Sequence, residues 1–334
     1  KLSFNLMQKT NFNFAKLFFT SDGSSAIEAS LKMAYQFFAN QGLKRPLFVA
    51  FENGYHGETI GALAVGGESI YKDIYKDILP KAIISKIPNN DSDNEILIAI
   101  SCLEDIFESN KDKICAIILE PLLQCAGGML LNSPLFVKKV KEVASKYGAF
   151  LILDEIAVGF GRTGTFFAYE QTDIVPDFLC LSKALGAGYL PIATTLISKK
   201  VADGFRGDIS KAFLHSHSYT GNALACAVAN AGLELFEKEN YLETNKPKIE
   251  KIEQRLELLK SHRNVKSIRQ IGMVGAVETT ANRRISAEVT KLSLGKNVFL
   301  RPLGSVIYTM PPYCISIEEI DLIFDAIQYC IDNL

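Results

Sequence analysis

The stretches AFLILD at residues 149–154 and FLCLSK at residues 178–183 decide the fold of this chain. Each is a short apolar run that ends abruptly, the first at Asp154 and the second at Lys183. Short bounded runs of this kind are typical of strands that are buried on both faces of a parallel sheet. Because the carboxyl ends of such strands meet at one crevice of an open α/β sheet, we expect both side chains to point into it.

Strand-like and helix-like segments alternate along the chain, which predicts an α/β fold with a mostly parallel central sheet sandwiched by helices. Strands are expected at 46–51, 115–119, 149–153, 178–182 and 193–198, and helices at 27–38, 133–147, 223–238 and 247–259. The polar stretch 70–100 predicts an irregular segment. The mixed pattern near the C-terminus predicts a smaller α+β domain, so we expect a large domain at 1–240 and a small one at 241–334.

Composition excludes several classes of partner. The 334 residues carry 36 Lys and Arg against 37 Asp and Glu, so no electrostatic argument favours nucleic acid or an anionic membrane. The seven cysteines include no C-x-x-C pair, which favours a reducing cytoplasm. No apolar stretch reaches transmembrane length. The chain starts without Met, which suggests an internal fragment or a missing start.

Lys183 and Asp154 together have the chemistry that pyridoxal phosphate requires. The amine forms a Schiff base, and the carboxylate holds the proton on the ring nitrogen. Taken singly, a lysine at a strand end is more often a solvated charge and an aspartate more often a helix cap. Their pairing one βαβ unit apart, and the small-residue loop ALGAG at 184–188, favour the cofactor site. No metal site is expected.

Two further segments suit the same cofactor. Gly23 and Ser24 precede an amphipathic helix, whose free N–H groups would bind a phosphate, although a plain serine N-cap is the commoner explanation. Tyr55 lies in NGYHG at 53–57, where glycines leave room for its ring to stack on a planar ligand. A core tyrosine is an equally good interpretation before this context is considered.

Three other features are less informative. Arg301 follows a strand-like run and would bind a substrate carboxylate, although a surface arginine is the default. His56 is interpreted as structural or as supporting the site indirectly, because the sequence supplies it with no metal or base partner. GFGRTG at 159–164 matches neither phosphate-loop pattern and is interpreted as a structured turn.

These residues resemble the class III, fold-type I pyridoxal phosphate aminotransferases over nearly the whole chain. Within that family, the C-terminal run is most similar to the members that act in biotin biosynthesis. The motifs are SDGS at 21–24, NGYHG at 53–57, EP at 120–121 with Gln124 and GGM at 127–129, DEIA at 154–157, CLSKAL at 180–185, GN at 221–222, VETT at 277–280, RP at 301–302, Gly304 and IYTMPPY at 307–313.

The resemblance implies a role for each matching position. The implied catalytic residues are Lys183, Asp154 and Tyr55: Lys183 would carry the cofactor, Asp154 would pair with its ring nitrogen, and Tyr55 would pack at the ring and contact substrate. Gly23 and Ser24 would bind the phosphate. His217 and Ser218 would reach the phosphate of the neighbouring subunit, which implies a homodimer with shared sites. Ser216, Arg301 and Tyr308 would contact the keto substrate.

The implied activity is a ping-pong transamination from S-adenosyl-L-methionine to 8-amino-7-oxononanoate. Two features favour this activity over that of a 4-aminobutyrate or acetylornithine aminotransferase. One is Ala157, at a position where several relatives that use glutamate or similar donors have Gln, and the other is the run 301–313. A non-catalytic pyridoxal-binding module is a further alternative. The chain departs from the family in HSHS at 215–218, at Ser216 and His217, and again at Val158. It begins where the family is already under way, so an N-terminal segment is expected to be absent.

Overall fold

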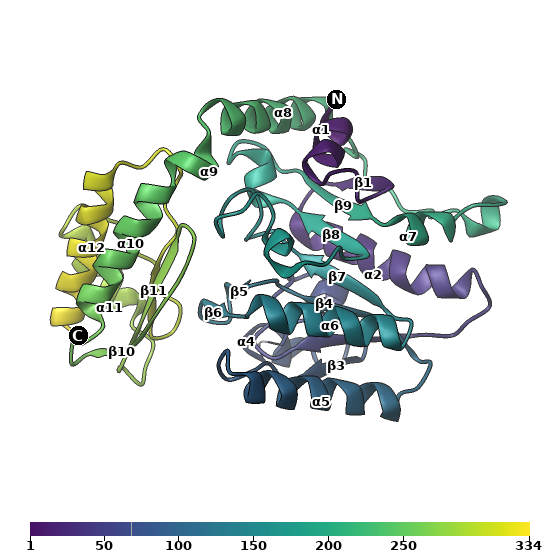
Figure 1. Cartoon of the computed structure of the whole chain (residues 1–334), viewed down its shortest axis with the longest axis horizontal. Coiled ribbons are helices and arrows are strands. Elements are labelled where there is room, and N and C mark those ends of the chain that lie inside the picture. The colour runs from purple at the N-terminus through teal and green to yellow at the C-terminus, as the bar shows by residue number, and fades with distance from the viewer. Residues whose placement is uncertain (68) are drawn as a thin grey trace.

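The computed structural model describes residues 1–67 and 69–334 and is built around a seven-stranded sheet (Figure 1). The strand order is β1-β9-β8-β7-β4-β2-β3, in which β9 is antiparallel to both of its neighbours and the other pairs are parallel. The mostly parallel sheet expected from the sequence is therefore confirmed. The strands are β1 (Lys16–Thr20), β2 (Leu47–Phe51), β3 (Ala82–Ser85), β4 (Ile114–Leu119), β7 (Phe150–Asp154), β8 (Phe178–Leu181) and β9 (Ala193–Ile197).

Helices cover both faces of this sheet (Figure 1). Successive residues of β7 alternate between two cores, because side chains of a strand point to opposite faces: Phe150 and Ile152 join one core, and Leu151 and Leu153 the other. The first core contains α2 (Gly23–Ala39), α3 (Ile60–Ala64) and α7 (Lys199–Asp203), and the second contains α1 (Leu2–Lys9), α5 (Asp93–Ser109), α6 (Pro134–Lys146) and α8 (Ala223–Lys238).

One expectation from the sequence is wrong. The stretch 70–100, predicted to be irregular, contains α4 (Ser69–Lys72), the short 3-10 helix Asp73–Tyr75, strand β3 and the start of α5. The α5 helix begins after Ser92, whose hydroxyl accepts the N–H of Glu95, and it buries Ile96, Ile100 and Leu103 against the sheet. The apolar residues of this helix recur at helical spacing past residue 100, so their periodicity is recognisable only over the full length of the helix.

The C-terminal part forms a second sheet with its own core (Figure 1). Three antiparallel strands in the order β10-β11-β12 carry helices on one face, and α9 (Tyr241–Thr244) precedes them. A small hairpin of β5 (Leu123–Gln124) and β6 (Leu130–Leu131) extends from the large sheet toward this part. The other elements are α10 (Lys246–Leu259), β10 (Val265–Ile271), β11 (Val274–Thr279), α11 (Ser286–Leu294), β12 (Val306–Thr309) and α12 (Ile317–Asp332).

All seven cysteines are free, and three of them are buried. Among the residues that the structure describes, no helix combines the length and the apolar composition needed to cross a bilayer.

Candidate active site

A cavity of about 490 Å³ opens at the carboxyl ends of β2, β4, β7 and β8. Its walls come from the loops that follow these strands, from the start of α2 and from the C-terminal part of the chain. Seven of the residues singled out from the sequence line it: Gly23, Ser24, Tyr55, Asp154, Lys183, Arg301 and Tyr308. The structure therefore brings together positions that lie far apart in the sequence.

Lys183 follows β8 directly and begins the 3-10 helix Lys183–Gly186. Its φ of 38° lies in the left-handed region, where a side chain with a Cβ costs about 1–3 kcal/mol and persists only when its surroundings impose it. Among the described residues, no carboxylate forms an ion pair with its ammonium group. The amine is thus held at the cavity with no competing partner, as a nucleophile requires.

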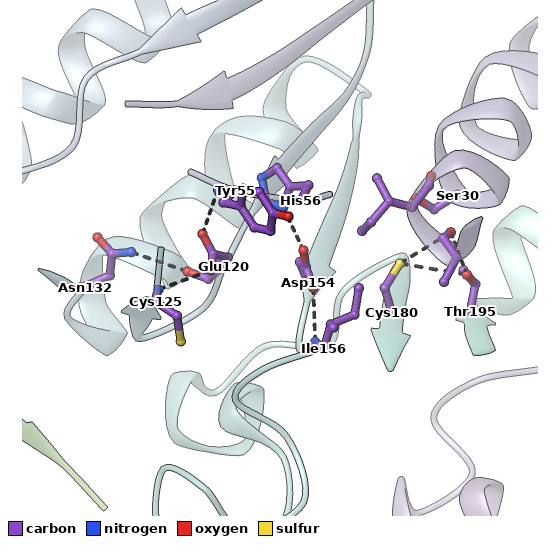
Figure 2. A network of polar contacts seen from close by, with 12 residues as sticks. Ser30, Tyr55, His56, Glu120, Cys125, Asn132, Asp154, Ile156, Cys180 and Thr195 are labelled. Carbon is purple, nitrogen blue, oxygen red and sulfur yellow. Dashed lines mark hydrogen bonds and ion pairs between the residues drawn. The ribbon is translucent and has the colours of Figure 1, made fainter. Parts of the chain in front are cut away.

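Asp154 ends β7 and is buried, with 4% of its surface exposed. Its Oδ1 accepts the N–H of Ile156 at 3.0 Å, and its Oδ2 lies 2.8 Å from Nδ1 of His56. No helix opens after Asp154, so the alternative of a helix cap is excluded. The interpretation of His56 as a residue that supports the site indirectly is confirmed, because the fold places this buried imidazole against the carboxylate, a partner that the sequence did not reveal (Figure 2).

The His56 contact orients the carboxylate of Asp154. An ionised aspartate only accepts hydrogen bonds, so Nδ1 of His56 is the donor. Nε2 of His56 is buried and has no hydrogen-bond partner among the described residues. The imidazole therefore holds one oxygen of the Asp154 carboxylate in a fixed position at the cavity.

The start of α2 forms an anion cradle. Asp22 is the N-cap, and its side chain accepts from both the N–H and the hydroxyl of Ser25. Gly23 and Ser24 line the cavity, and their N–H groups belong to the first turn, at the positive end of a 17-residue helix, where N–H groups have no partner within the helix. The plain serine N-cap considered from the sequence is therefore replaced by an aspartate cap.

Gly57 is required for the shape of this cradle. A Cβ at Gly57 would lie 2.1 Å from Oγ of Ser24, and the φ of +122° is unfavourable for any other residue. We expect Gly57→Ala to lower the affinity for pyridoxal phosphate at least about tenfold, because the clash moves the hydroxyl of Ser24, which lines the cavity beside the start of α2. Titration of each protein with pyridoxal phosphate, followed by absorbance, measures the affinity. Gly164→Ala is the control, since its φ of +103° imposes similar strain with no atom within 4 Å; equal affinities of the two variants would contradict the prediction.

Tyr55 lies on the cavity wall with its ring 5.1 Å from that of Tyr71. Its backbone N–H donates to Oε2 of Glu120 and its hydroxyl to Glu58. Burial, together with the Glu58 hydrogen bond, raises the pKa of the phenol to about 12. The ring thus offers an aromatic surface on which a planar ligand can stack.

Ile156 and Glu120 are among the residues that line the cavity and received no individual role from the sequence. Ile156 lies two residues after Asp154 and packs against the start of α2, where a Cβ on Gly23 would meet its Cδ1 at 3.0 Å. Glu120 follows β4 and accepts the N–H groups of Tyr55 and Cys125 (Figure 2). Burial raises the pKa of this carboxyl to about 7. Both occur in quoted motifs, but only the fold shows what they contact.

Glu155 is buried behind the cavity and accepts the N–H groups of Ala168 and Tyr169, each at 2.7 Å. Burial raises the pKa of its carboxyl from 4.5 to about 8. Between these two values the folded protein holds a proton that the unfolded chain has released, so stability falls as the pH rises.

We expect Glu155→Gln, which mimics the neutral acid, to remove part of this pH dependence. Between pH 5 and pH 8 the free energy of unfolding should decrease in the unmodified protein and decrease less in the variant. The difference between the two decreases should be on the order of a few kcal/mol. Urea denaturation at both pH values measures the difference. The exposed Glu142→Gln serves as the control. Parallel pH profiles for the Glu155 variant and the unmodified protein would contradict the prediction.

The C-terminal part supplies one wall of the cavity through Arg301, Leu303, Tyr308 and Met310. Arg301 is exposed at its edge, and Tyr308 belongs to β12. The wall thus combines one guanidinium with apolar side chains, which suits a ligand that has a carboxylate at the end of an aliphatic chain.

Ser216, His217 and Ser218 do not line the cavity of their own chain. They lie in the loop that precedes α8, where the N–H of His217 donates to Thr220 and the ring of His217 contacts that of His215. Ser216 and Ser218 are exposed. Their implied roles at a cofactor and a substrate are not met within one chain.

The described residues fit pyridoxal phosphate. The cradle of α2 suits its phosphate, the amine of Lys183 its aldehyde, and the buried carboxylate of Asp154 its ring nitrogen. Tyr55 and Ile156 supply two nonpolar surfaces for a planar ring. No cluster of three or more potential metal ligands occurs among the described residues. Fold and site together define an α/β protein of the class that uses this cofactor.

Comparison with known proteins gives the family. The model for aminotransferase class-III matches residues 1–331, so the chain belongs to that family. It is 43% identical to the adenosylmethionine-8-amino-7-oxononanoate aminotransferase of Helicobacter pylori, over 100% of this chain and 78% of that protein. It is 39% identical to the protein of the same name from Aquifex aeolicus, over 96% of this chain and 75% of that protein.

Solved structures agree with the fold. The adenosylmethionine-8-amino-7-oxononanoate aminotransferase of Methanocaldococcus jannaschii superposes with a TM-score of 0.94 at 32% identity, over 99% of this chain and 78% of that one. An amine transaminase from an uncultivated Pseudomonas species, solved in a PLP-bound form, gives a TM-score of 0.94 at 28% identity, over 99% of this chain and 80% of that one. The fold-type I aminotransferase architecture expected from the sequence is confirmed.

Proposed function

We propose that this chain is a pyridoxal phosphate-dependent aminotransferase that moves the amino group of S-adenosyl-L-methionine to 8-amino-7-oxononanoate, giving 7,8-diaminononanoate in biotin biosynthesis. The observation that carries the proposal is the meeting of Lys183, Asp154 and the α2 cradle in one cavity whose far wall contains Arg301. The relatives that share this name across several bacteria support the choice of substrates.

Lys183 and Asp154 perform the chemistry in this proposal. When bound, pyridoxal phosphate supplies an aldehyde that takes up the amino group and a ring that accepts the electron pair of the breaking substrate C–H bond. Nζ of Lys183 would move the proton from the substrate carbon to the cofactor carbon that receives the nitrogen, and in the second half-reaction it would move a proton from that carbon to the carbon of the keto substrate. Asp154, held by His56 and by the N–H of Ile156, keeps its negative charge at the ring nitrogen.

The other cavity residues bind and orient. Gly23 and Ser24 hold the phosphate, and Tyr55 and Ile156 pack on the ring. Arg301 binds the carboxylate of the keto substrate, while Tyr308 and its apolar neighbours contact the aliphatic chain. This division gives the phosphate to the start of α2, the reacting groups to Lys183 and Asp154, and the substrate carboxylate to the wall that the C-terminal part supplies.

The amino donor is tested by a half-reaction. Mixing the cofactor-loaded enzyme with S-adenosyl-L-methionine alone should bleach the visible absorbance of the bound cofactor, and adding the keto acid should restore it. Mass spectrometry of the product of the second step identifies the acceptor. Bleaching by an ω-amino acid such as 4-aminobutyrate or N-acetylornithine, without bleaching by S-adenosyl-L-methionine, would instead assign the chain to another class III activity.

We further propose that the chain acts as a homodimer with shared sites. The loop that carries Ser216, His217 and Ser218 is flanked by exposed apolar side chains, with Leu214 77% and Tyr219 73% exposed, which suits contact with a second copy. Mixing Lys183→Ala with a His217→Ala/Ser218→Ala variant should regenerate one intact site per mixed dimer and about a quarter of full activity. No regain after subunit exchange would contradict site sharing.

The domain division and the compartment belong to the same proposal. We place the large cofactor-binding domain at 1–240 and the small domain at 241–334, because the C-terminal sheet has a core separate from the two cores of the large sheet. We place the reaction in the cytoplasm, because seven free cysteines suit a reducing compartment.

A further inference from the structure

We propose that Arg269 is a positioning residue that locks the C-terminal sheet onto the β5–β6 hairpin and so sets the width of the substrate end of the cavity. The inference rests on the proposed function for its catalytic readout, but its structural readout does not depend on which substrate is used.

The contact joins two parts of the chain that the sequence separates widely. Arg269 lies in β10, and its Nη2 donates to the carbonyl oxygen of Gly128 at 2.9 Å. Gly128 and Met129 have φ values of +100° and +57°, so the hairpin turn has a defined shape. In Figure 1 this hairpin is the element of the large part that extends toward β10 and β11.

The guanidinium is held in place from its own sheet. Its Nη1 donates to Oε2 of Glu278 at 2.7 Å and to the hydroxyl of Ser267 at 3.0 Å. The side chains of Arg269 and Glu278 are only 15% and 19% exposed. Water therefore screens this ion pair less than it screens the fully exposed salt bridges that contribute little to stability. Although burial alone would raise it, hydrogen bonds from Lys266 and Arg269 lower the pKa of Glu278 to about 2.

Strand register connects this contact to the cavity. Arg269 pairs with Ala276 of β11, and Ala276 pairs with Tyr308 of β12. Cross-strand neighbours point to the same face of a sheet, so Arg269 and Tyr308 lie in one row on the face that meets the large part. Tyr308 lines the cavity on this side.

The hairpin supplies the opposing wall. Met129, the residue after Gly128, and Cys125 both line the cavity. The hydrogen bond from Arg269 to Gly128 therefore fixes the distance between the Met129 wall and the Tyr308 wall. Lys183 and Asp154 belong to a different part of the cavity, at the ends of β8 and β7, and neither contacts this link.

The test compares Arg269→Met with Lys266→Met in the cofactor-loaded full chain. Lys266 binds the same Glu278 at 2.6 Å but has no bond to the hairpin, which makes it a matched control. We expect Arg269→Met to raise amide hydrogen exchange of residues 123–131 about tenfold. We also expect KM for the keto substrate to rise about tenfold, with kcat changed much less, since substrate binding and not chemistry is affected.

Arg269→Lys provides a second variant if the methionine variant is unstable. One ammonium group replaces a forked guanidinium, so it should keep the ion pair with Glu278 and lose the bond to Gly128. Its thermal stability should be near that of the unmodified protein, while hairpin exchange stays raised. The absorbance of bound cofactor should be unchanged in all variants.

Equal hairpin exchange in the Arg269 variants and in Lys266→Met would overturn the proposal, as would a fall in kcat without a rise in KM. Failure of the unmodified protein to turn over the keto substrate would instead count against the proposed function. The exchange measurement would then still decide whether Arg269 holds the hairpin.

Discussion

Lys183→Ala is expected to abolish transamination, with kcat reduced at least about 10⁴-fold. The variant removes both the amine that binds the cofactor covalently and the group that moves the proton. It should fold normally, since Lys183 lies at the cavity and alanine has the same backbone preferences. A steady-state assay measures the loss. The exposed Lys146→Ala serves as the control, because this lysine binds Glu104 and lies over the ring of Tyr147, and neither of these residues lines the cavity.

Covalent attachment gives a second readout for the same variant. After borohydride reduction, mass spectrometry should find the added mass of the cofactor on the peptide that contains Lys183 in the unmodified protein, and on no peptide of the variant. Retention of more than about 1% of kcat, or labelling of another lysine, would contradict the assignment of Lys183. A purely regulatory binding module would keep cofactor binding and show no turnover even without the substitution.

Asp154→Asn is expected to reduce kcat about 10³-fold while the protein stays folded. Asparagine has the same size, and its carbonyl oxygen still accepts the N–H of Ile156. The negative charge is lost, and with it the interaction that keeps a proton on the ring nitrogen of the cofactor. Turnover is measured with saturating cofactor, so that weaker binding does not contribute.

Asp177→Asn is the matched control for this change. Asp177 is also a buried carboxylate beside the central sheet, but it binds Lys141 and the N–H of Leu151 away from the cavity. Its substitution should lower stability and leave kcat of the folded protein nearly unchanged. A similar loss of kcat in both variants would mean that Asp154 acts through stability alone.

The local elements were largely predictable from the sequence. The runs that end at Asp154 and Lys183 form β7 and β8, and the helix expected at 223–238 is α8. Such elements follow from apolar periodicity and from turn residues, which act over a few positions. Helix α5 was missed because its apolar positions extend beyond the stretch considered, and its N-cap Ser92 lies within a polar loop.

The candidate site was predictable only in part. The reactive side chains at the ends of two predicted strands indicated the roles of Lys183 and Asp154. The roles of Arg301 and Tyr308 were inferred chiefly from the family resemblance. His56 was given no base partner, although it lies 2.8 Å from Asp154, because the two residues are 98 positions apart. Periodicity holds no information about a contact of that kind.

The sequence by itself determined which segments become buried strands and which reactive side chains end them, because strand burial and side-chain chemistry are local properties. Only the tertiary structure decided that His56 meets Asp154, that Glu120 binds the loops of Tyr55 and Cys125, and that Arg269 reaches Gly128. Those contacts join distant segments, and they form only when the packing of two sheets and their helices offsets the entropy of closing the loops between them.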